Sequence, residues 1–313
     1  MLTPDQRCLN RPWTDALMTH AWHGPRLAMS GFFFKDRNLH EYAQTCLGLG
    51  LSGVDLWPWN VNNYSPQEAA AILRSYSLSV MSVNIPGNLF RLGHDFSAPD
   101  LQREVKVLVD LARACETRFV QMYCASPQSG DLVGSAQQLA KAIREFRSTV
   151  GSDVGILLEN NLDQRREDLL GLNPSRDVST LVATIHELGQ PDVRICFDAA
   201  NSVAVGHDAT AQFRAARDFI ALIHVKDCER FDPIRHVGRK ESVFLLRDFL
   251  NGDFLPTVIG AGVLNWKVLA WEMMRSYSDD DAMWAVIDPF IDISLLDWWC
   301  VQSVAAWRHL SKA

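Results

Sequence analysis

One apolar run in the chain ends abruptly in ionisable side chains. Residues 219–223 are apolar throughout, and His224, Lys226 and Asp227 follow them closely. A short apolar run bounded by polar residues is typical of a strand that is buried on both faces. Such a strand delivers its last side chains either to a functional site or to an ordinary polar turn. One strand alone does not choose between these interpretations.

Three other stretches that are largely apolar end in a carboxylate. In a parallel α/β barrel, the carboxyl ends of the strands converge on one face, where active sites lie. The four side chains would then meet as three carboxylates and one imidazole, an oxygen-rich ligand set that suits Mn²⁺, Mg²⁺ or Co²⁺. The three runs are 154–158, 193–197 and 282–287, and the residues that follow them are Glu159, Asp198 and Asp288.

Segments with strand character alternate with segments of helical periodicity. Ser65, Pro66 and Glu68 suit the N-cap, first and third positions of a helix. This alternation predicts a parallel sheet, and eight units predict its closure into a barrel. The predicted strands are 26–34, 53–57, 78–84, 119–124, 154–159, 193–198, 219–224 and 282–288, and the other predicted helices are 39–49, 98–115, 135–146, 179–188, 210–217, 266–274 and 295–310.

The predicted fold is a single α/β domain over residues 1–313, a (β/α)8 TIM barrel with two additions. Residues 1–25 look irregular, with Pro4 and Pro12, and are expected to form an N-terminal extension. A long polar loop, 228–256, is expected after the seventh strand. Loops of this length are uncommon in compact domains and are usually functional, so this loop is expected to serve the site.

The net charge, the apolar runs and the cysteine spacing exclude several classes of protein. The net charge of −7 argues against binding to nucleic acid, whose protein partners usually carry clustered positive charge. No apolar run is long enough to span a membrane, and the first residues lack the apolar centre of a signal peptide. The seven cysteines form no C-x-x-C pair. These features predict a reduced, cytoplasmic protein without a thiolate zinc site.

The motifs at the strand ends, taken in order, resemble those of a known superfamily. Glu159 stands in L-L-E-N-N, Asp198 in F-D-A-A-N and His224 in H-V-K-D. Gly260 and Gly262 then precede L-N-W, and a last carboxylate follows. From about residue 26 to 310 the chain resembles the xylose-isomerase-like sugar isomerases and epimerases, with their inosose-dehydratase-like members.

The resemblance implies a TIM barrel that holds one divalent metal ion, Mn, Co, Mg or Zn. Three positions depart from the family pattern. Asp288 replaces the usual glutamate, Asn201 stands where histidine is frequent, and Ala261 lies between the two glycines where an acidic residue is usual. The ligands that the resemblance implies are Glu159, Asp198, His224 and Asp288.

A metal ion that chelates a sugar carbonyl and the neighbouring hydroxyl acts as a Lewis acid. The proton on the hydroxyl-bearing carbon then becomes easier to remove, and a carboxylate can take it. Glu159 and Asp288 are the candidate catalytic residues, one to remove a proton and one to return it. The expected function is isomerisation or epimerisation of a keto-sugar or a cyclitol through an enediolate.

Other functions remain open at this stage. If a leaving group lies β to the carbonyl, the same enediolate eliminates it, which gives a sugar or inosose dehydratase or another lyase. The Asp288 and Asn201 departures also leave open a barrel subunit without catalytic activity. A phosphodiester hydrolase with several zinc ions is disfavoured, because few of the nine histidines lie at strand ends and the chain is acidic.

Five residues are candidates for binding a small carbohydrate substrate: Trp57, Asn84, Asn161, Asn201 and Lys226. Aromatic faces suit the apolar faces of sugars, although core packing explains Trp57 equally well. The Asn161 amide suits a sugar hydroxyl or the support of Glu159. Lys226 suits a substrate oxygen or a salt bridge with a nearby carboxylate.

Two smaller expectations concern the surface. His236, in the long loop, is expected to be a solvated loop residue. Trp298 and Trp299 are expected in the core or at a subunit interface, which leaves a homo-oligomer open.

Overall fold

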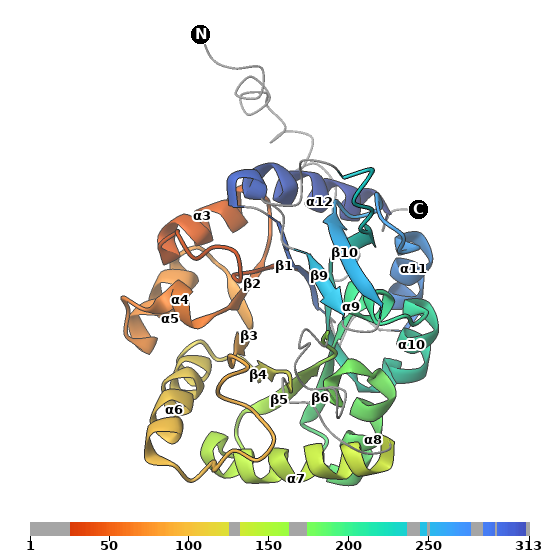
Figure 1. Cartoon of the computed structure of the whole chain (residues 1–313). Helices are drawn as coiled ribbons and strands as arrows, with labels where there is room; N and C mark the ends of the chain where they lie inside the picture. Colours follow the sequence, from red (N-terminus) through yellow and green to blue (C-terminus); the bar gives the residue numbers. More distant parts are fainter. Residues whose placement is uncertain are drawn as a thin grey trace.

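Eight parallel strands close into a barrel in the order β1–β11–β7–β6–β5–β4–β3–β2 (Figure 1). The computed structural model describes residues 26–124, 132–162, 174–236, 245–248, 251–276, 284–291 and 293–310. The predicted α/β barrel is confirmed, while the N-terminal extension (1–25) lies outside the described residues. The strands are β1 Arg26–Ser30, β2 Gly53–Leu56, β3 Ser79–Asn84, β4 Phe119–Met122, β5 Gly155–Glu159, β6 Val193–Asp198, β7 Ile220–Val225 and β11 Trp284–Ile287.

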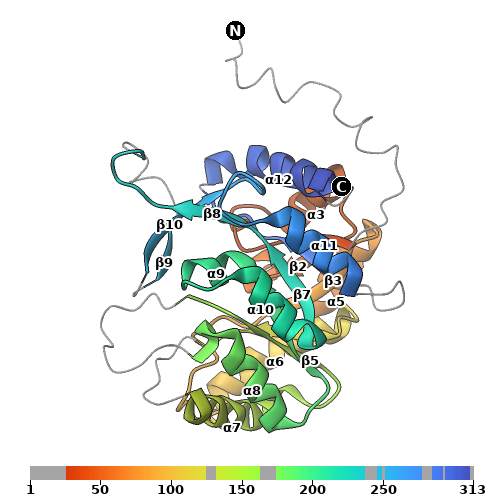
Figure 2. The same ribbon diagram turned by 90° about the vertical axis from the view of Figure 1, so that its right-hand side faces the viewer.

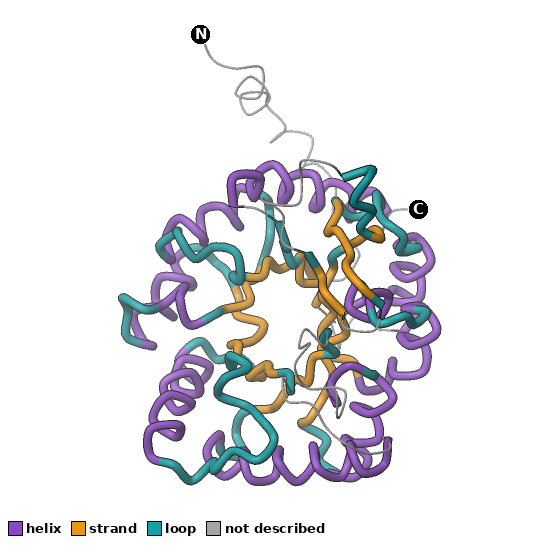
Figure 3. The backbone as a smooth tube through the Cα atoms, viewed as in Figure 1, coloured by secondary structure: helices purple, strands orange, loops and turns teal. Residues whose placement is uncertain are grey.

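Helices form a ring outside the barrel (Figure 3). Their starts follow the sequence: Ser65 accepts a hydrogen bond from the backbone N–H of Glu68, whose carboxylate binds the backbone N–H of Ser65 in return. No described helix combines the length and apolar character needed to cross a membrane. The helices are α3 Leu39–Gly48, α4 Pro58–Val61, α5 Pro66–Ser75, α6 Pro99–Ala114, α7 Leu132–Val150, α8 Val178–Leu188, α9 Ala199–Ala204, α10 Ala209–Ala216, α11 Trp266–Ser276 and α12 Leu296–Leu310, with 3-10 turns η1 Pro174–Arg176, η2 Arg217–Phe219 and η3 Ile293–Leu295.

The barrel interior is polar at the carboxyl ends of the strands and apolar in the remaining part. All five residues of β5 are buried, as expected for a strand covered by helices on one side and by the barrel interior on the other. The apolar part of the interior lies below the carboxyl ends of the strands, where the polar side chains gather. It is filled by Ala28, Met81, Phe119, Leu157, Cys196, Leu222 and Val286.

The long loop predicted after β7 contains a small antiparallel sheet instead, with strand order β8–β10–β9. Part of the predicted loop therefore has regular structure. Because β8 continues from β7, the sheet stands at the carboxyl end of the barrel (Figure 2). Its strands are β8 Asp227–Arg230, β9 Leu246–Asp248 and β10 Gly252–Thr257.

Pro256 is the reason that the sequence does not predict this sheet. A proline lacks the N–H that a central strand needs, so it argues against a strand. Among the described residues, β9 pairs with residues 252–254, and Pro256 pairs with Cys228 of β8. Pro256 thus lies beyond the end of β9, and its missing N–H removes no hydrogen bond to that strand.

A buried ion pair between Arg176 and Asp248 connects the sheet of β8 to β10 to the barrel. The Arg176 guanidinium donates two hydrogen bonds to the Asp248 carboxylate, at 3.0 and 2.8 Å, and a third to the carbonyl of Val205 at 3.3 Å. Burial favours the neutral acid, but the guanidinium holds the pKa of Asp248 below its ordinary value. The connection after β5, the end of α9 and strand β9 are thereby held together at the carboxyl end of the barrel.

Candidate metal centre at the carboxyl end of the barrel

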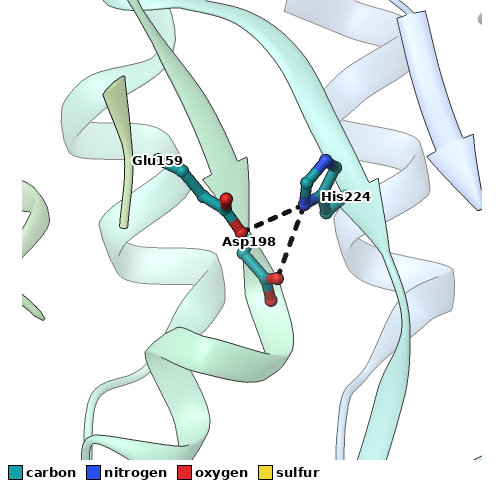
Figure 4. Close-up of side chains that lie close together, drawn as sticks. All are labelled: Glu159, Asp198 and His224. Atoms are coloured by element: carbon teal, nitrogen blue, oxygen red, sulfur yellow. Dashed lines mark hydrogen bonds and ion pairs between the residues drawn. The ribbon is translucent and has the colours of Figure 1, made fainter. Parts of the chain in front are cut away.

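Three of the predicted ligands meet at the ends of adjacent strands (Figure 4). The Nδ1 atom of His224 lies 3.2 Å from Glu159 Oε1 and 3.7 Å from Asp198 Oδ2. One ligand atom from each residue lies within 4.8 Å of the other two, and all three side chains are buried. We call Glu159, Asp198 and His224 the carboxylate–imidazole triad.

The strands and the start of α9 set the positions of the triad. Asp198 is paired in register with His224 across β6 and β7. Its Oδ1 caps α9 by accepting the N–H of Asn201 at 2.8 Å, which leaves Oδ2 to face His224 and Lys226. Asn160 holds the Asp198 backbone on both sides, accepting its N–H at 2.7 Å and donating to its carbonyl at 2.8 Å.

The donor set of the triad fits a divalent cation. Two carboxylates and one imidazole are common ligands for Mn²⁺, Co²⁺ or Zn²⁺. Burial opposes the charged imidazolium, but Cys196, Glu159 and Asp198 raise the pKa of His224 well above its ordinary value. The proton on Nδ1 therefore faces carboxylates, and a cation that binds there must displace it.

Asp288 lies outside the triad and faces a lysine. Its carboxylate is 3.2 Å from the Lys226 ammonium, which is also 2.6 Å from Asp198 Oδ2. Burial opposes the charge on Lys226, but Asp198 and Asp288 raise its pKa above the ordinary value. The ammonium therefore bridges two carboxylates, which is the salt-bridge alternative for Lys226.

Comparison with known proteins places this barrel in a family. The family model of the xylose isomerase-like TIM barrel matches residues 43–279. The chain belongs to this family. A sequence search of the curated proteins found no significant match.

Solved structures with the same fold include two whose names state an activity. One is the probable 3-DHS dehydratase AsbF from Bacillus anthracis, at 15% identity and a TM-score of 0.63, covering 90% of this chain and 97% of that one. Another is D-psicose 3-epimerase from Clostridium cellulolyticum H10, at 14% identity and a TM-score of 0.62, covering 91% and 99%. At these identities the likeness shows the fold alone.

The glycine pair of this xylose isomerase-like barrel shapes a loop. The Asp227 carboxylate accepts the backbone N–H groups of Gly260 at 3.0 Å, Gly262 at 3.1 Å and Leu264 at 3.2 Å. A Cβ at Gly262 would collide with that carboxylate and with the carbonyl of Cys228, and Gly260 has φ +82°. The loop is thus built around Asp227, which accounts for both glycines.

The predicted substrate-binding asparagines are engaged within the protein. Asn84 donates to Asp55 Oδ1 at 2.6 Å and to the carbonyl of Leu56 at 3.1 Å. Asn201 donates to the carbonyl of Asn160 at 2.9 Å, while its own buried Oδ1 has no hydrogen-bond partner among the described residues. Asn161, which is half-buried, accepts the N–H of Leu162 at 2.7 Å.

The aromatic candidate, Trp57, lies in a cluster of aromatic rings beside the carboxyl ends of β1 and β2. Trp57 is buried and stacks on Trp59, with ring centroids 4.9 Å apart, and Phe32 meets it edge-on at 4.7 Å. The indole N–H of Trp57 is buried and has no hydrogen-bond partner in the part of the chain that the structure describes. These contacts fit the core-packing interpretation of Trp57.

His236 is buried, so the expectation of a solvated loop residue was wrong. Its exposed fraction is 6%, and its ring stacks on Phe231. The backbone N–H of Asp232 donates to Nδ1 at 3.0 Å, and Nε2 lies 3.2 Å from Glu229 Oε1. Trp299 is buried while Trp298 is half exposed, so only Trp298 reaches the surface.

Three polar residues that were not predicted from the sequence, Asp55, Ser82 and Gln121, extend the polar layer from β2 to β4. Asp55 is fully buried, and its Oδ1 accepts hydrogen bonds from Ser82 and Asn84, while none of the described residues donates to Oδ2. A charged or amide residue inside a short buried strand was the available signal. G-V-D-L for Asp55 and F-V-Q-M for Gln121 both carry it.

We expect the metal-free protein to lose stability as the pH rises toward 7 because of Asp55. Burial raises the pKa of Asp55 to about 7, although His224, Ser82 and Asn84 lower it. An unfolded aspartate ionises near pH ~4, so between about pH 4 and 7 the folded chain holds the extra proton and stability falls with rising pH. Asp55→Asn should shrink the loss of unfolding free energy between about pH 5 and 8 by about 2–3 kcal/mol.

Urea unfolding of both proteins with EDTA at the two pH values measures this difference. An exposed aspartate variant, Asp218→Asn, serves as the control and should leave the pH dependence unchanged. Equal pH dependence in the Asp55→Asn variant and the unaltered chain would show that Asp55 ionises normally.

Proposed function

We propose that this barrel is a divalent-metal-dependent isomerase or epimerase that acts on a keto-sugar or a cyclitol. The observation that supports it is the convergence of the carboxylate–imidazole triad, with ligand atoms within 4.8 Å at the ends of β5, β6 and β7. Active sites of TIM barrels lie at this end. The likeness of the fold to a D-psicose 3-epimerase agrees with the proposal.

The triad residues Glu159, Asp198 and His224 are the ligands in this proposal. When bound, a divalent cation supplies Lewis acidity to a carbonyl and its neighbouring hydroxyl. Because Lys226 holds Asp288 outside the triad, we assign Asp288 to proton transfer. Lys226 also keeps a positive charge beside the site, where it can donate a hydrogen bond to a substrate oxygen.

Two carboxylates divide the proton transfer. The Glu159 carboxylate removes the proton from the hydroxyl-bearing carbon. Asp288, on the far side of β6 and β7 in the barrel order, returns a proton together with the neighbouring Lys226 ammonium. Return to the carbonyl carbon, with the hydroxyl proton passing to the former carbonyl oxygen, gives isomerisation, and return to the opposite face of the original carbon gives epimerisation.

Exchange with solvent deuterium tests the proposal. The Mn²⁺-loaded protein is incubated in D₂O with a panel of unphosphorylated keto-sugars and cyclitol ketones. We expect deuterium at the carbon next to the carbonyl of at least one compound, with loss of exchange after EDTA and recovery on adding Mn²⁺. Loss of water from the substrate would assign the lyase instead. No exchange and no elimination would support the subunit without catalytic activity.

A further inference from the structure

The two ring nitrogens of His224 have different neighbours. Nδ1 faces the triad carboxylates, whereas Nε2 lies 3.3 Å from the side-chain nitrogen of Gln121, on β4. Gln121 is buried, with an exposed fraction of 1%. Nδ1 is therefore the ligand atom of the proposed metal centre, and Gln121 is the group that contacts the opposite nitrogen.

The amide of Gln121 has one orientation in this structure, and each of its ends has a polar neighbour. Its nitrogen donates to Glu159 Oε2 at 3.2 Å, and its oxygen lies 3.4 Å from Ser82 Oγ. The same nitrogen lies 3.3 Å from His224 Nε2, so in this orientation the amide offers that ring nitrogen a donor and no acceptor. A proton on Nε2 would place donor against donor.

Metal binding through Nδ1 demands the opposite arrangement. A ligating imidazole is bare at the metal-facing nitrogen and donates its other N–H to an acceptor. His224 Nε2 would then carry the proton, and Gln121 is the hydrogen-bond partner that the structure gives this nitrogen. Its amide supplies an acceptor only when the oxygen replaces the nitrogen, by a half turn of the side-chain amide.

The surroundings accommodate the turned amide. Ser82 donates its hydroxyl proton to Asp55 Oδ1, so its oxygen is free to accept the amide N–H of Gln121. Glu159 Oε2 loses the amide donor at the same time, which frees that oxygen for a cation. The turn therefore leaves each group near Gln121 either paired or available to the metal.

We propose that Gln121 is a positioning residue whose side-chain amide turns to accept the Nε2 proton of His224, and thereby makes Nδ1 available to a divalent cation. The inference rests on the proposed metal centre. Loss of a hydrogen-bond partner of a metal-binding histidine typically lowers the metal affinity by about 10- to 100-fold. Gln121 acts through His224 and Glu159 and has no contact of its own with the cation.

Three variants test the proposal by Mn²⁺ titration calorimetry. Gln121→Met keeps the length of the side chain and removes donor and acceptor, so Mn²⁺ affinity should fall about 10- to 100-fold. Gln121→Glu supplies an acceptor only and should bind Mn²⁺ at least as tightly as the unaltered chain. Thr117→Val, the matched control, removes a buried hydrogen bond to the carbonyl of Met81 and should leave the affinity unchanged.

A spectroscopic measurement separates positioning from general destabilisation. In the Zn²⁺-loaded chain with ¹⁵N-labelled histidine, His224 should show a protonated Nε2 and a metal-bound Nδ1. Equal Mn²⁺ affinity of Gln121→Met and the unaltered chain, or a protonated Nδ1 in the loaded chain, would overturn the role of Gln121 alone. Failure of the unaltered chain to bind either metal would overturn the metal centre and this inference together. If Gln121→Met does not fold, weaker Mn²⁺ binding by Gln121→Glu than by the unaltered chain contradicts the proposal.

Discussion

Glu159→Gln is expected to lower kcat/KM for the deuterium-exchange reaction by about 10³-fold or more. The substitution keeps the size of the side chain, removes its negative charge and leaves a poor base. Glu159 has two roles in the proposed site, as a ligand beside His224 and as the group that takes the substrate proton. Proton transfer by a placed side chain alone contributes about 10²- to 10⁴-fold, and weaker metal binding adds to the loss.

The exchange rate is measured at saturating Mn²⁺, so that incomplete metal loading does not account for the whole effect. Glu187→Gln is a suitable control, because Glu187 pairs with Arg144 at the surface, where an ion pair contributes little. A Glu159→Gln variant that keeps more than about a tenth of the activity would exclude Glu159 as the base.

Lys226→Met is expected to destabilise the metal-free protein by about 3–5 kcal/mol. Its ammonium is the cation shared by two buried carboxylates, Asp198 and Asp288. Removing one member of a buried ion pair leaves charge without a partner in a region that water does not reach. Urea unfolding with EDTA measures the loss.

Metal should compensate part of this loss. A cation bound by the triad supplies the positive charge that Asp198 has lost, so Mn²⁺ should raise the stability of Lys226→Met more than that of the unaltered chain. Lys106→Met, which breaks an exposed pair with Asp110, should cost less than about 1 kcal/mol. A similarly small cost for Lys226→Met would contradict the bridging role.

The barrel and the meeting of the triad were predictable because both follow from a local rule. A strand that is buried on both faces has an apolar sequence, and parallel strands bring their carboxyl ends together. Glu159, Asp198 and His224 each mark such an end, so their approach needed no knowledge of side-chain conformation.

Other parts of the site depend on interactions that the sequence pattern does not encode. Asp288 lies at the end of its strand, as Glu159 does, yet its carboxylate pairs with Lys226. This pairing depends on side-chain conformations, which the sequence pattern does not predict. Asp55 and Gln121 are single polar residues within apolar strands, and their roles appear only when β2 to β5 lie side by side. The sheet of β8 to β10 was not predicted because Pro256 argues against a strand. Whether a proline is tolerated at this position depends on where β9 begins.

The metal content of the purified chain tests the central claim most directly. The protein and a Glu159→Ala/His224→Ala double variant are reconstituted with Mn²⁺, freed of unbound metal and measured by elemental analysis. The account predicts about one equivalent of metal in the unaltered chain and none in the double variant. Absence of metal from the unaltered chain, or equal metal in both proteins, would contradict the proposed centre.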